Sequence, residues 1–172
     1  MAVNRDELRQ LQEPLKERYR EDPDAAMVTL QAQGELGQGV TCSVQTGRAL
    51  AAAVAGLHPA TGGDGLSLCS GDMLLEALAA CAGVTLRAVA TSLEIPVSGG
   101  RVHVEGDLDF RGTLAVSKEA PVGFAEIRLR FELETTATPD QLDSLLRLTE
   151  RYCVVYQTLA GSPRLSATWE TA

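Results

Sequence analysis

The sequence has little positive charge for its acidic content. Lysine and arginine together number 15, against 23 aspartate and glutamate residues, and the formal net charge is −8. A chain with this balance gains no net electrostatic attraction to phosphate backbones or to anionic lipid. Nucleic acid is therefore a poor candidate partner.

Long apolar runs are also missing. No stretch approaches the roughly 18 uninterrupted apolar residues that a membrane span requires. The first twenty residues, MAVNRDELRQLQEPLKERYR, lack the apolar core of a signal peptide. We therefore expect a cytoplasmic protein with no membrane partner.

Histidine and cysteine are scarce. The chain has four cysteines, two histidines (His58 and His103) and no C-x-x-C pair. These cysteines are too few for the disulfide framework of a secreted domain, and neither histidine has ligand spacing relative to a cysteine. We expect no structural metal and no bound cofactor.

What is present predicts one folded domain. The chain has 172 residues, of which 45% are hydrophobic, enough to bury a core. Its periodicities predict the α+β fold class. The expected elements are a helix from residue 4, a hairpin of strands 27–33 and 40–46, a helix over 72–93, strands 101–110 and 125–134, a helix from residue 138 and a final strand over 164–170.

Two of the helix starts carry capping signals. Asn4 is followed by Glu7, and Thr138 is followed by Pro139 and Gln141. In this pattern the first side chain accepts a hydrogen bond from the backbone three residues on, and the Glu or Gln side chain reaches back. Proline in the first helical position favours the second start further.

The strands at 101–110 and 125–134 alternate apolar and polar residues, which is typical of half-buried antiparallel neighbours. The polar side of the first strand carries a row of potential ligands, namely His103, Glu105, Asp107 and Asp109. A metal site and a solvated strand face are the two interpretations of this row. The solvated face is much the more common arrangement.

Two cysteines fall on inward helical faces. Cys81 lies in LLEALAACAGVTL (74–86), where the predicted apolar stripe is Leu74, Ala77, Leu78, Cys81, Val84 and Ala88. The stripe of the next helix, Leu142, Leu145, Leu146 and Thr149, reaches Cys153 when it is continued by four residues. Taken singly, each inward cysteine can be explained as a small apolar residue of the core. If the fold brings them within disulfide distance, one thiol can attack an oxidant and the other can resolve the sulfenic acid.

The other two cysteines have simpler explanations. Cys42 shares the apolar side of the strand 40–46 and is expected to be a small buried hydrophobic residue. Cys69 lies in a loop rich in Gly, Pro and Asp before the long helix. We expect a structural or incidental role for it.

Four segments resemble successive blocks of the OsmC/Ohr family, the osmotically inducible protein C and organic hydroperoxide resistance proteins. They are SGDMLLEALAACAGVTL, EGDLDFRG, APVGFAEIRLRF and LLRLTERYCVVYQTL. The resemblance covers about residues 26–170, and the two cysteine blocks are its most specific part. Residues 1–25 are then an N-terminal helical extension, and residues 26–172 are an OsmC-like domain.

The resemblance implies an intertwined homodimer in which antiparallel sheets wrap around two central helices. It also implies a thiol peroxidase that reduces organic hydroperoxides at the subunit interface and is recycled by a dithiol reductant. Cys81 matches the peroxidatic residue and Cys153 the resolving one, and Asp72 falls where many members have a glutamate near the thiol. Nine residues of helix span about 13 Å, so Asp72 can reach Cys81 only from a partner subunit, and helix capping is its competing role.

The sequence departs from the family pattern at two points. The family arginine lies in the first hairpin turn, which is GELGQG here, and Val154 replaces the proline that usually follows the resolving cysteine. Without a nearby cation, a thiol in apolar surroundings keeps a raised pKa. Arg48, just past the hairpin, is the candidate substitute, with Arg87 and Arg151 as alternatives.

These departures leave three functions open. The first is the peroxidase cycle of Cys81 and Cys153. The second is a dimeric small-molecule-binding or stress-response protein that keeps the scaffold, holds an apolar small molecule and has no peroxidase turnover. The last is a hydrolase with a thiol nucleophile, for which the sequence places no histidine as base.

Overall fold

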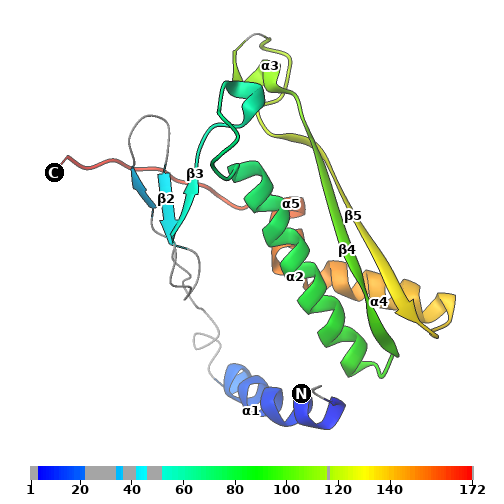
Figure 1. Cartoon of the computed structure of the whole chain (residues 1–172). Coiled ribbons are helices and arrows are strands. Elements are labelled where there is room, and N and C mark those ends of the chain that lie inside the picture. The colour runs from blue at the N-terminus through cyan, green and yellow to red at the C-terminus, as the bar shows by residue number, and fades with distance from the viewer. Residues whose placement is uncertain (1–3, 22–33, 37–41, 46–51, 116, 172) are drawn as a thin grey trace.

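The structure is a computed structural model that describes residues 4–21, 34–36, 42–45, 52–115 and 117–171. Its elements are α1 (Arg5–Glu21), β1 (Gly34–Leu36), β2 (Cys42–Gln45), β3 (Ala52–Ala55), the 3-10 helix η2 (Pro59–Thr61), α2 (Ser70–Ser92), β4 (Val97–Leu108), α3 (Phe110–Thr113), β5 (Phe124–Thr135), α4 (Pro139–Tyr152) and α5 (Val154–Gly161). The long helix α2 runs beside the β4–β5 hairpin (Figure 1). Helices α4 and α5 also pack against α2.

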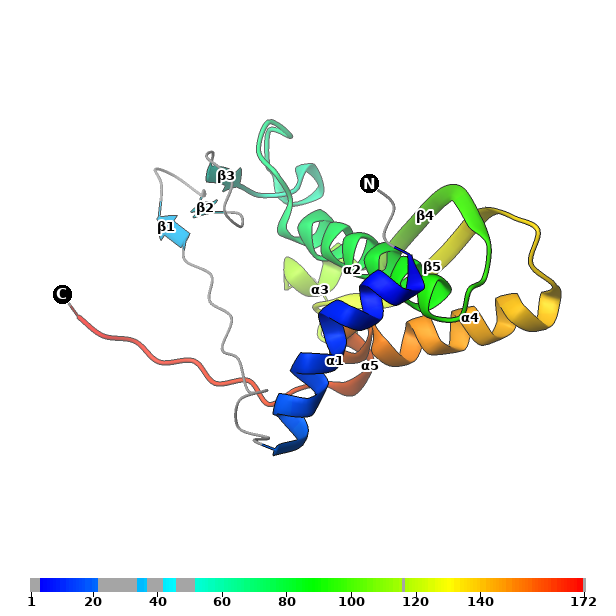
Figure 2. The ribbon, with the colours of Figure 1, turned by 90° about the horizontal axis from the view of Figure 1, so that it is seen from below.

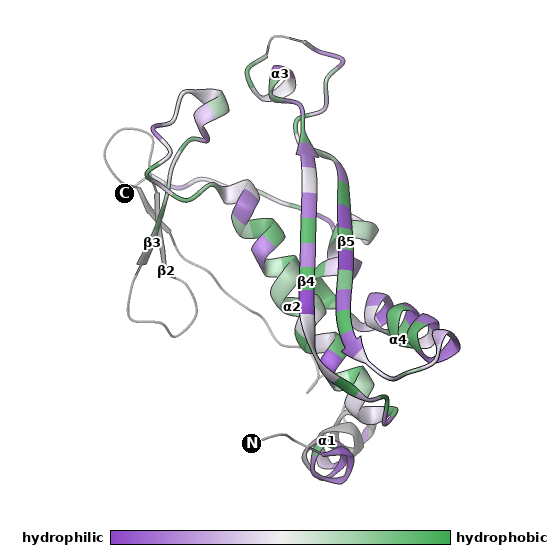
Figure 3. Ribbon diagram, turned by 45° about the vertical axis from the view of Figure 1, so that its right-hand side comes forward, coloured by the Kyte–Doolittle hydropathy of each residue, from purple (hydrophilic) through white to green (hydrophobic). Residues whose placement is uncertain are grey.

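The β4–β5 hairpin forms one wall of the molecule. Its strands pair antiparallel, with Val102 opposite Phe131 and Val104 opposite Leu129. Apolar and polar residues alternate along both strands (Figure 3), and Val104, Leu129 and Phe131 pack on the core cluster that includes the buried α2 residues Leu78 and Ala82. The antiparallel pair predicted from the alternation is confirmed.

The outer face of the hairpin is ion-paired. Arg128 Nη2 donates to Asp107 at 2.8 Å, and Arg128 Nη1 lies 3.2 Å from Glu126. His103 Nε2 lies 3.2 Å from Glu132. The hydrogen bond from Arg128 lowers the pKa of Asp107. The polar row of β4 therefore belongs to a solvated face whose charges are balanced across the hairpin.

One end of the hairpin departs from the predicted alternation. β4 ends at Leu108, and Asp109 instead caps α3 by accepting a hydrogen bond from the Arg111 N–H at 3.1 Å. The pairing register shifts between Asp107 and Leu108. Ala125, which was predicted to face inward, is consequently exposed. Such a shift comes from the pairing of two strands and has no signature in either strand alone.

The buried side of α2 is rotated from the predicted stripe. Its buried residues are Leu78, Ala82, Leu86 and Ala90. Leu74 and Val84, both predicted to face inward, are 38% and 72% exposed. Because α2 is apolar on nearly every side, its periodicity could not decide which side β4, β5, α4 and α5 would cover.

Two further properties of α2 follow from its composition. A Cβ atom at Gly83 would lie 3.4 Å from Val102 Cγ2, so the missing side chain lets α2 approach β4 closely.

By its length and composition alone, α2 could cross a membrane, but the core helix of a soluble protein meets the same criterion. The cytoplasmic location stays a prediction.

The core consists of two neighbouring clusters along α2. The buried members of the first are Leu86, Ala90, Ile95 and Leu145, which join α2 to α4. The buried members of the second are Leu78, Ala82 and Cys153, which join α2 to the α4–α5 junction. Phe131 of β5 packs against both clusters. A candidate cysteine is therefore part of the core.

The capping signals predicted both helix starts correctly. Gln141 N–H donates to Thr138 Oγ1 at 3.4 Å, and Thr138 N–H donates to Gln141 Oε1 at 2.9 Å. At α1, Glu7 N–H donates to Asn4 Oδ1 at 2.9 Å, and Asn4 N–H donates to Glu7 Oε2 at 3.0 Å. Helix α1 contacts α2 (Figure 2), and Arg5 Nη1 lies 2.7 Å from Glu94 Oε2.

The small sheet has the order β1-β2-β3 and differs from the predicted hairpin. β2 agrees with the predicted strand 40–46, but its first partner, β1, lies within GELGQG, which was predicted to be a turn. The predicted strand 27–33 lies outside the described residues. β3 pairs with β2 and was not predicted. The choice of partner depends on long-range pairing, which local turn residues do not reveal.

The predicted final strand is wrong for the single chain. Residues 162–171 form no helix or strand, and Leu165 and Trp169 are 91% and 84% exposed. The segment extends away from the rest of the chain (Figure 2). A strand needs a hydrogen-bonded neighbour, and none of the described strands pairs with this segment.

Candidate active site

The fold brings Cys81 and Cys153 together. Cys81 lies in the middle of α2 and is half-buried, whereas Cys153 is 0% exposed at the junction of α4 and α5. Cys153 is a buried member of the second core cluster, Cys81 packs against that cluster, and each thiol shifts the pKa of the other. Both are free thiols. The inward position predicted for Cys153 is confirmed.

The α4–α5 junction fixes Cys153. Its backbone is extended, with φ −73° and ψ 110°, so it ends α4 and precedes the first residue of α5. Its N–H donates to Thr149 O at 2.9 Å, and its carbonyl accepts from Gln157 N–H at 2.9 Å. The Gln157 side chain also donates to Glu150 O at 2.9 Å, which ties α5 to α4. These bonds hold the sulfur against α2.

Hydrogen bonding makes Cys81 a stronger acid than an ordinary thiol. Burial acts to raise its pKa, but four groups that hydrogen-bond to the sulfur outweigh burial and lower the pKa. These groups are the backbone N–H of Val155, the thiol of Cys153, the backbone N–H of Val154 and the hydroxyl of Thr85. Donors of this kind stabilise the thiolate over the thiol.

Cys153 has the opposite tendency. Burial raises its pKa, and so do its hydrogen bond to Cys81 and the negative charge that Cys81 carries as a thiolate. These effects outweigh the backbone N–H groups of Tyr156 and Val155, which lower the pKa. Of the two thiols, Cys81 therefore loses its proton at lower pH and Cys153 keeps its proton to higher pH.

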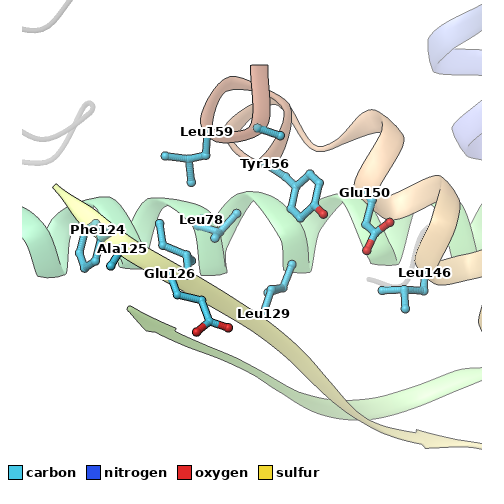
Figure 4. Close-up of a pocket in the computed structure, with 11 residues that line it drawn as sticks. Leu78, Phe124, Ala125, Glu126, Leu129, Leu146, Glu150, Tyr156 and Leu159 are labelled. Atoms are coloured by element: carbon cyan, nitrogen blue, oxygen red, sulfur yellow. The ribbon is translucent and has the colours of Figure 1, made fainter. Parts of the chain in front are cut away.

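A groove of about 410 Å³ adjoins the pair. It lies between β5, α2 and the α4–α5 segment, and its lining includes Leu78, Leu129, Leu146, Glu150, Tyr156 and Leu159 (Figure 4). Leu78 is one helical turn before Cys81, and Leu78 and Tyr156 also belong to the cluster that holds both thiols. Most of the lining side chains are apolar, and the two carboxylates are those of Glu126 and Glu150.

Asp72 lies at a different cavity in the single chain. It is the third residue of α2, whose N-cap is Cys69, so Asp72 does not cap the helix. It lines a cavity of about 350 Å³ with His58, Cys69 and Phe110, and the His58 and Phe110 rings stack at 4.9 Å. As expected from the helix length, Asp72 does not meet the Cys81 of its own chain.

The arginine candidates do not contact Cys81 in the described structure. Arg48 lies outside the described residues. Arg87 Nη1 donates to Val97 O at 2.6 Å, and Arg151 lies over the Tyr152 ring at 5.5 Å. Among the described residues, no charged side chain hydrogen-bonds to Cys81.

Sequence reasoning missed the donors that act on Cys81. Thr85 follows Cys81 by four residues on the same helix, a spacing that places both side chains on one face and was available as a signal. Val154 and Val155 act through the backbone, and the sequence VVYQTLAG does not mark a helix start. Cys42 lies in β2, where the structure does not describe its side chain, and Cys69 is half-buried beside Asp72.

Nothing in the described part of the chain forms a metal site. Among those residues, no group of three or more His, Cys, Asp and Glu side chains is arranged to hold an ion.

The sequence and the fold were compared with known proteins. The family model described as OsmC-like protein matches residues 62–168, which include both cysteines. No curated protein sequence matches the chain significantly.

Three solved structures illustrate the likeness of fold. An OsmC-like protein from Mycoplasma pneumoniae is 16% identical with a TM-score of 0.65, covering 78% of this chain and 89% of that chain. An organic hydroperoxide resistance protein from Elizabethkingia anophelis is 14% identical with a TM-score of 0.62, covering 79% and 91%. A protein from Legionella pneumophila described as organic hydroperoxide resistance protein OsmC is 17% identical with a TM-score of 0.59, covering 78% and 93%.

The family match spans more than half of the chain, and the structural matches share its arrangement of helices and antiparallel sheet. The chain belongs to the OsmC-like protein family.

Proposed function

We propose that the protein is a thiol-dependent peroxidase that reduces organic hydroperoxides. One observation carries the proposal: two free thiols contact each other in an apolar cluster, and their pKa values are shifted in opposite directions. Cys81 is the better thiolate and is half-exposed, so it attacks the peroxide. Cys153 is buried and has a raised pKa, so it resolves the product.

The reaction has two steps on the protein. The Cys81 thiolate attacks the terminal oxygen of the hydroperoxide, an S–O bond forms, the O–O bond breaks, and the alkoxide takes a proton from solvent to leave as alcohol. Cys81 is thereby oxidised to a sulfenic acid. The sulfur of Cys153 then attacks the sulfenic sulfur, a disulfide forms, and the hydroxyl leaves with the thiol proton as water. A dithiol reductant regenerates both thiols by exchange and is itself oxidised to a disulfide.

The groove beside the thiols supports an organic peroxide as substrate. Its apolar side chains, among them Leu78, Leu129 and Leu159, would hold a hydrocarbon tail near Cys81. Its carboxylates, Glu126 and Glu150, disfavour an anionic substituent on that tail. An uncharged, apolar hydroperoxide is the substrate class that fits these walls.

The proposal includes a homodimer. The exposed side of α2 carries an uncovered stripe of Leu74, Ala77, Ala80 and Val84. An unpartnered apolar helix face of this kind favours packing against a second copy, and small residues allow two helices to approach closely. In an intertwined dimer, Asp72 of one subunit would stand near Cys81 of the other.

The peroxidase proposal is tested by single-turnover kinetics. We expect the reduced wild-type protein to consume cumene hydroperoxide in stopped-flow experiments, and Cys81→Ser to fall to the uncatalysed background. Cys153→Ser is the matched control, because it keeps the attacking thiol: it should complete one turnover and accumulate a dimedone-reactive sulfenic acid at Cys81. Background rates in the wild-type protein would refute the proposal.

A second candidate function is binding without turnover. It is supported by the groove of about 410 Å³ and by the lack of an arginine in GELGQG. Native mass spectrometry after mild purification distinguishes the two functions. A retained apolar ligand together with a slowly reacting Cys81 would favour binding, whereas fast peroxide consumption favours the enzyme.

A further inference from the structure

We infer that the reductant reopens the Cys81–Cys153 disulfide by attacking the sulfur of Cys81, because a wall of side chains separates Cys153 from solvent and from the groove. The inference deepens the proposed function and rests on it in taking the two cysteines as a redox pair. It names the sulfur to which the reductant becomes bonded and the residues that decide this choice.

The groove of about 410 Å³ and the cluster around Cys153 share one set of side chains. Its members line the groove on one side and pack into the cluster on the other. They come from α2, β5 and α5 (Figure 4), and they are Leu78, Ile127, Leu129, Tyr156 and Leu159. In the described part of the chain, neither cysteine lines the groove. A reagent in the groove therefore meets this wall before it meets Cys153.

Other residues close the remaining sides of Cys153. Val104 of β4 and Phe131 of β5 pack on the same cluster, and Ala82 of α2 is a buried member of it. The exposed fraction of Cys153 is consequently 0%. Cys81 packs against the cluster from α2 but keeps part of its surface exposed to solvent. Of these two cysteines, Cys81 is the one that a reagent can contact.

Leaving-group chemistry favours the other sulfur. In thiol–disulfide exchange the thiol with the lower pKa leaves more readily, and the pKa is lowered at Cys81 and raised at Cys153. This effect alone would direct the attack to Cys153 and release Cys81. The rate also depends on access to the attacked sulfur, however, and burial denies that access at Cys153. Packing therefore decides which sulfur reacts.

The exchange then has a defined order. A thiolate of the dithiol attacks Cys81 Sγ, an S–S bond forms between the reductant and Cys81, and the Cys81–Cys153 bond breaks. Cys153 leaves as a thiolate and takes a proton from water. The second thiolate of the reductant attacks the sulfur of the first, closes the disulfide of the reductant and releases Cys81 as a thiolate. The protein gains the two electrons that the dithiol loses.

Trapping the mixed disulfide identifies the attacked sulfur. Diamide oxidises the two thiols to a disulfide without a peroxide, and after its removal the protein reacts briefly with β-mercaptoethanol, a small monothiol. Acid stops the exchange, N-ethylmaleimide in urea labels the free thiols, and peptide mass spectrometry locates both groups. We expect mercaptoethanol on Cys81 and maleimide on Cys153, in about ten-fold or greater excess over the reverse pattern at early times.

Leu159→Ala opens the wall, and Leu146→Ala is its matched control. Both changes delete the same atoms from the lining of the groove, but only Leu159 packs on the cluster that holds Cys153 in the described structure. Leu159→Ala should raise the fraction of mixed disulfide at Cys153 by about three-fold or more, because access to that sulfur improves. Leu146→Ala should keep the wild-type fraction. Circular dichroism checks that both variants are folded.

Each outcome decides the inference. A mixed disulfide mainly at Cys153 in the wild-type protein would overturn it, and so would equal fractions in folded Leu159→Ala and Leu146→Ala. The wild-type result is sufficient if Leu159→Ala does not fold.

The failure of this inference can be told from that of the peroxidase. A protein that does not consume cumene hydroperoxide, yet carries mercaptoethanol on Cys81, would refute the peroxidase and leave this inference standing. If diamide forms no disulfide between Cys81 and Cys153, both are overturned.

Discussion

Cys81 and Cys153 are the same residue type, yet their surroundings move their pKa values in opposite directions. Both are penalised by burial, which disfavours any thiolate. At Cys81 hydrogen bonding from Val155, Val154 and Thr85 outweighs burial, whereas at Cys153 burial and the charge of Cys81 outweigh the backbone N–H groups. The different positions of the two cysteines in the cluster therefore make Cys81 the more acidic thiol and Cys153 the less acidic one.

The side chains around the thiols should also carry much of the stability. Leu78 is 1% exposed and packs beside both cysteines. We expect Leu78→Ala to lower the free energy of unfolding by about 2–5 kcal/mol, because the lost contacts leave a cavity. Urea unfolding monitored by circular dichroism measures the change.

Leu66→Ala is the control for that prediction. It deletes the same atoms from a side chain that is 89% exposed, and the loss should be about 0.5 kcal/mol or less. Equal losses at the two positions would contradict the assignment of Leu78 to the core, or would show that an assembly covers Leu66.

At the scale of elements, the break between α4 and α5 creates the site. A continuous helix would bury the amides of Val154 and Val155 in its own hydrogen bonds, and they could not reach Cys81. The extended backbone of Cys153 interrupts the ladder, and the hydrogen bond from Gln157 to Glu150 O holds the two helices in place. The start of α4 is defined equally well by Thr138 and Gln141.

The α4 cap predicts a measurable loss. Thr138→Ala removes the side-chain oxygen that accepts from Gln141 N–H and should lower the free energy of unfolding by about 1 kcal/mol. Thr138→Ser keeps an acceptor in the same place and should stay near the wild-type value. A Ser variant as unstable as the Ala variant would show that the methyl group, and not the cap, is responsible.

At the scale of the whole molecule, one chain leaves much apolar surface uncovered. Val84 on α2, Leu66 in the loop before it, and Leu165 and Trp169 in the C-terminal segment are each more than two-thirds exposed. Large apolar side chains left in water favour burial in an interface. The proposed homodimer would cover it and would give the C-terminal segment a neighbour.

The dimer can be tested with the single tryptophan of the chain. Light scattering should give twice the 18.2 kDa of one chain. Trp169, which is 84% exposed in one chain, should be protected from iodide quenching in the native protein and become accessible in urea. A monomeric mass with freely quenched fluorescence would contradict the dimer.

The sequence itself determined those features of the protein that depend on interactions between residues close together in the chain. The caps at Asn4 and Thr138 start their helices because side chain and backbone lie within three residues of each other. The alternation over 101–110 and 125–134 makes a two-sided hairpin, because the residue period of a strand is fixed. Helical spacing also predicted the inward position of Cys153, although the backbone of that residue is extended.

Only the tertiary structure decided which surfaces and groups would meet. The covered side of α2, the pairing of β1 with β2 and the unpaired segment 162–171 depend on contacts between residues distant in sequence. Two of the groups that lower the pKa of Cys81 are backbone N–H groups, which every residue except proline carries, so no side-chain pattern marks these two. The acidity of Cys81 therefore depends on where a helix begins in space, and folding alone brings that point to the thiol.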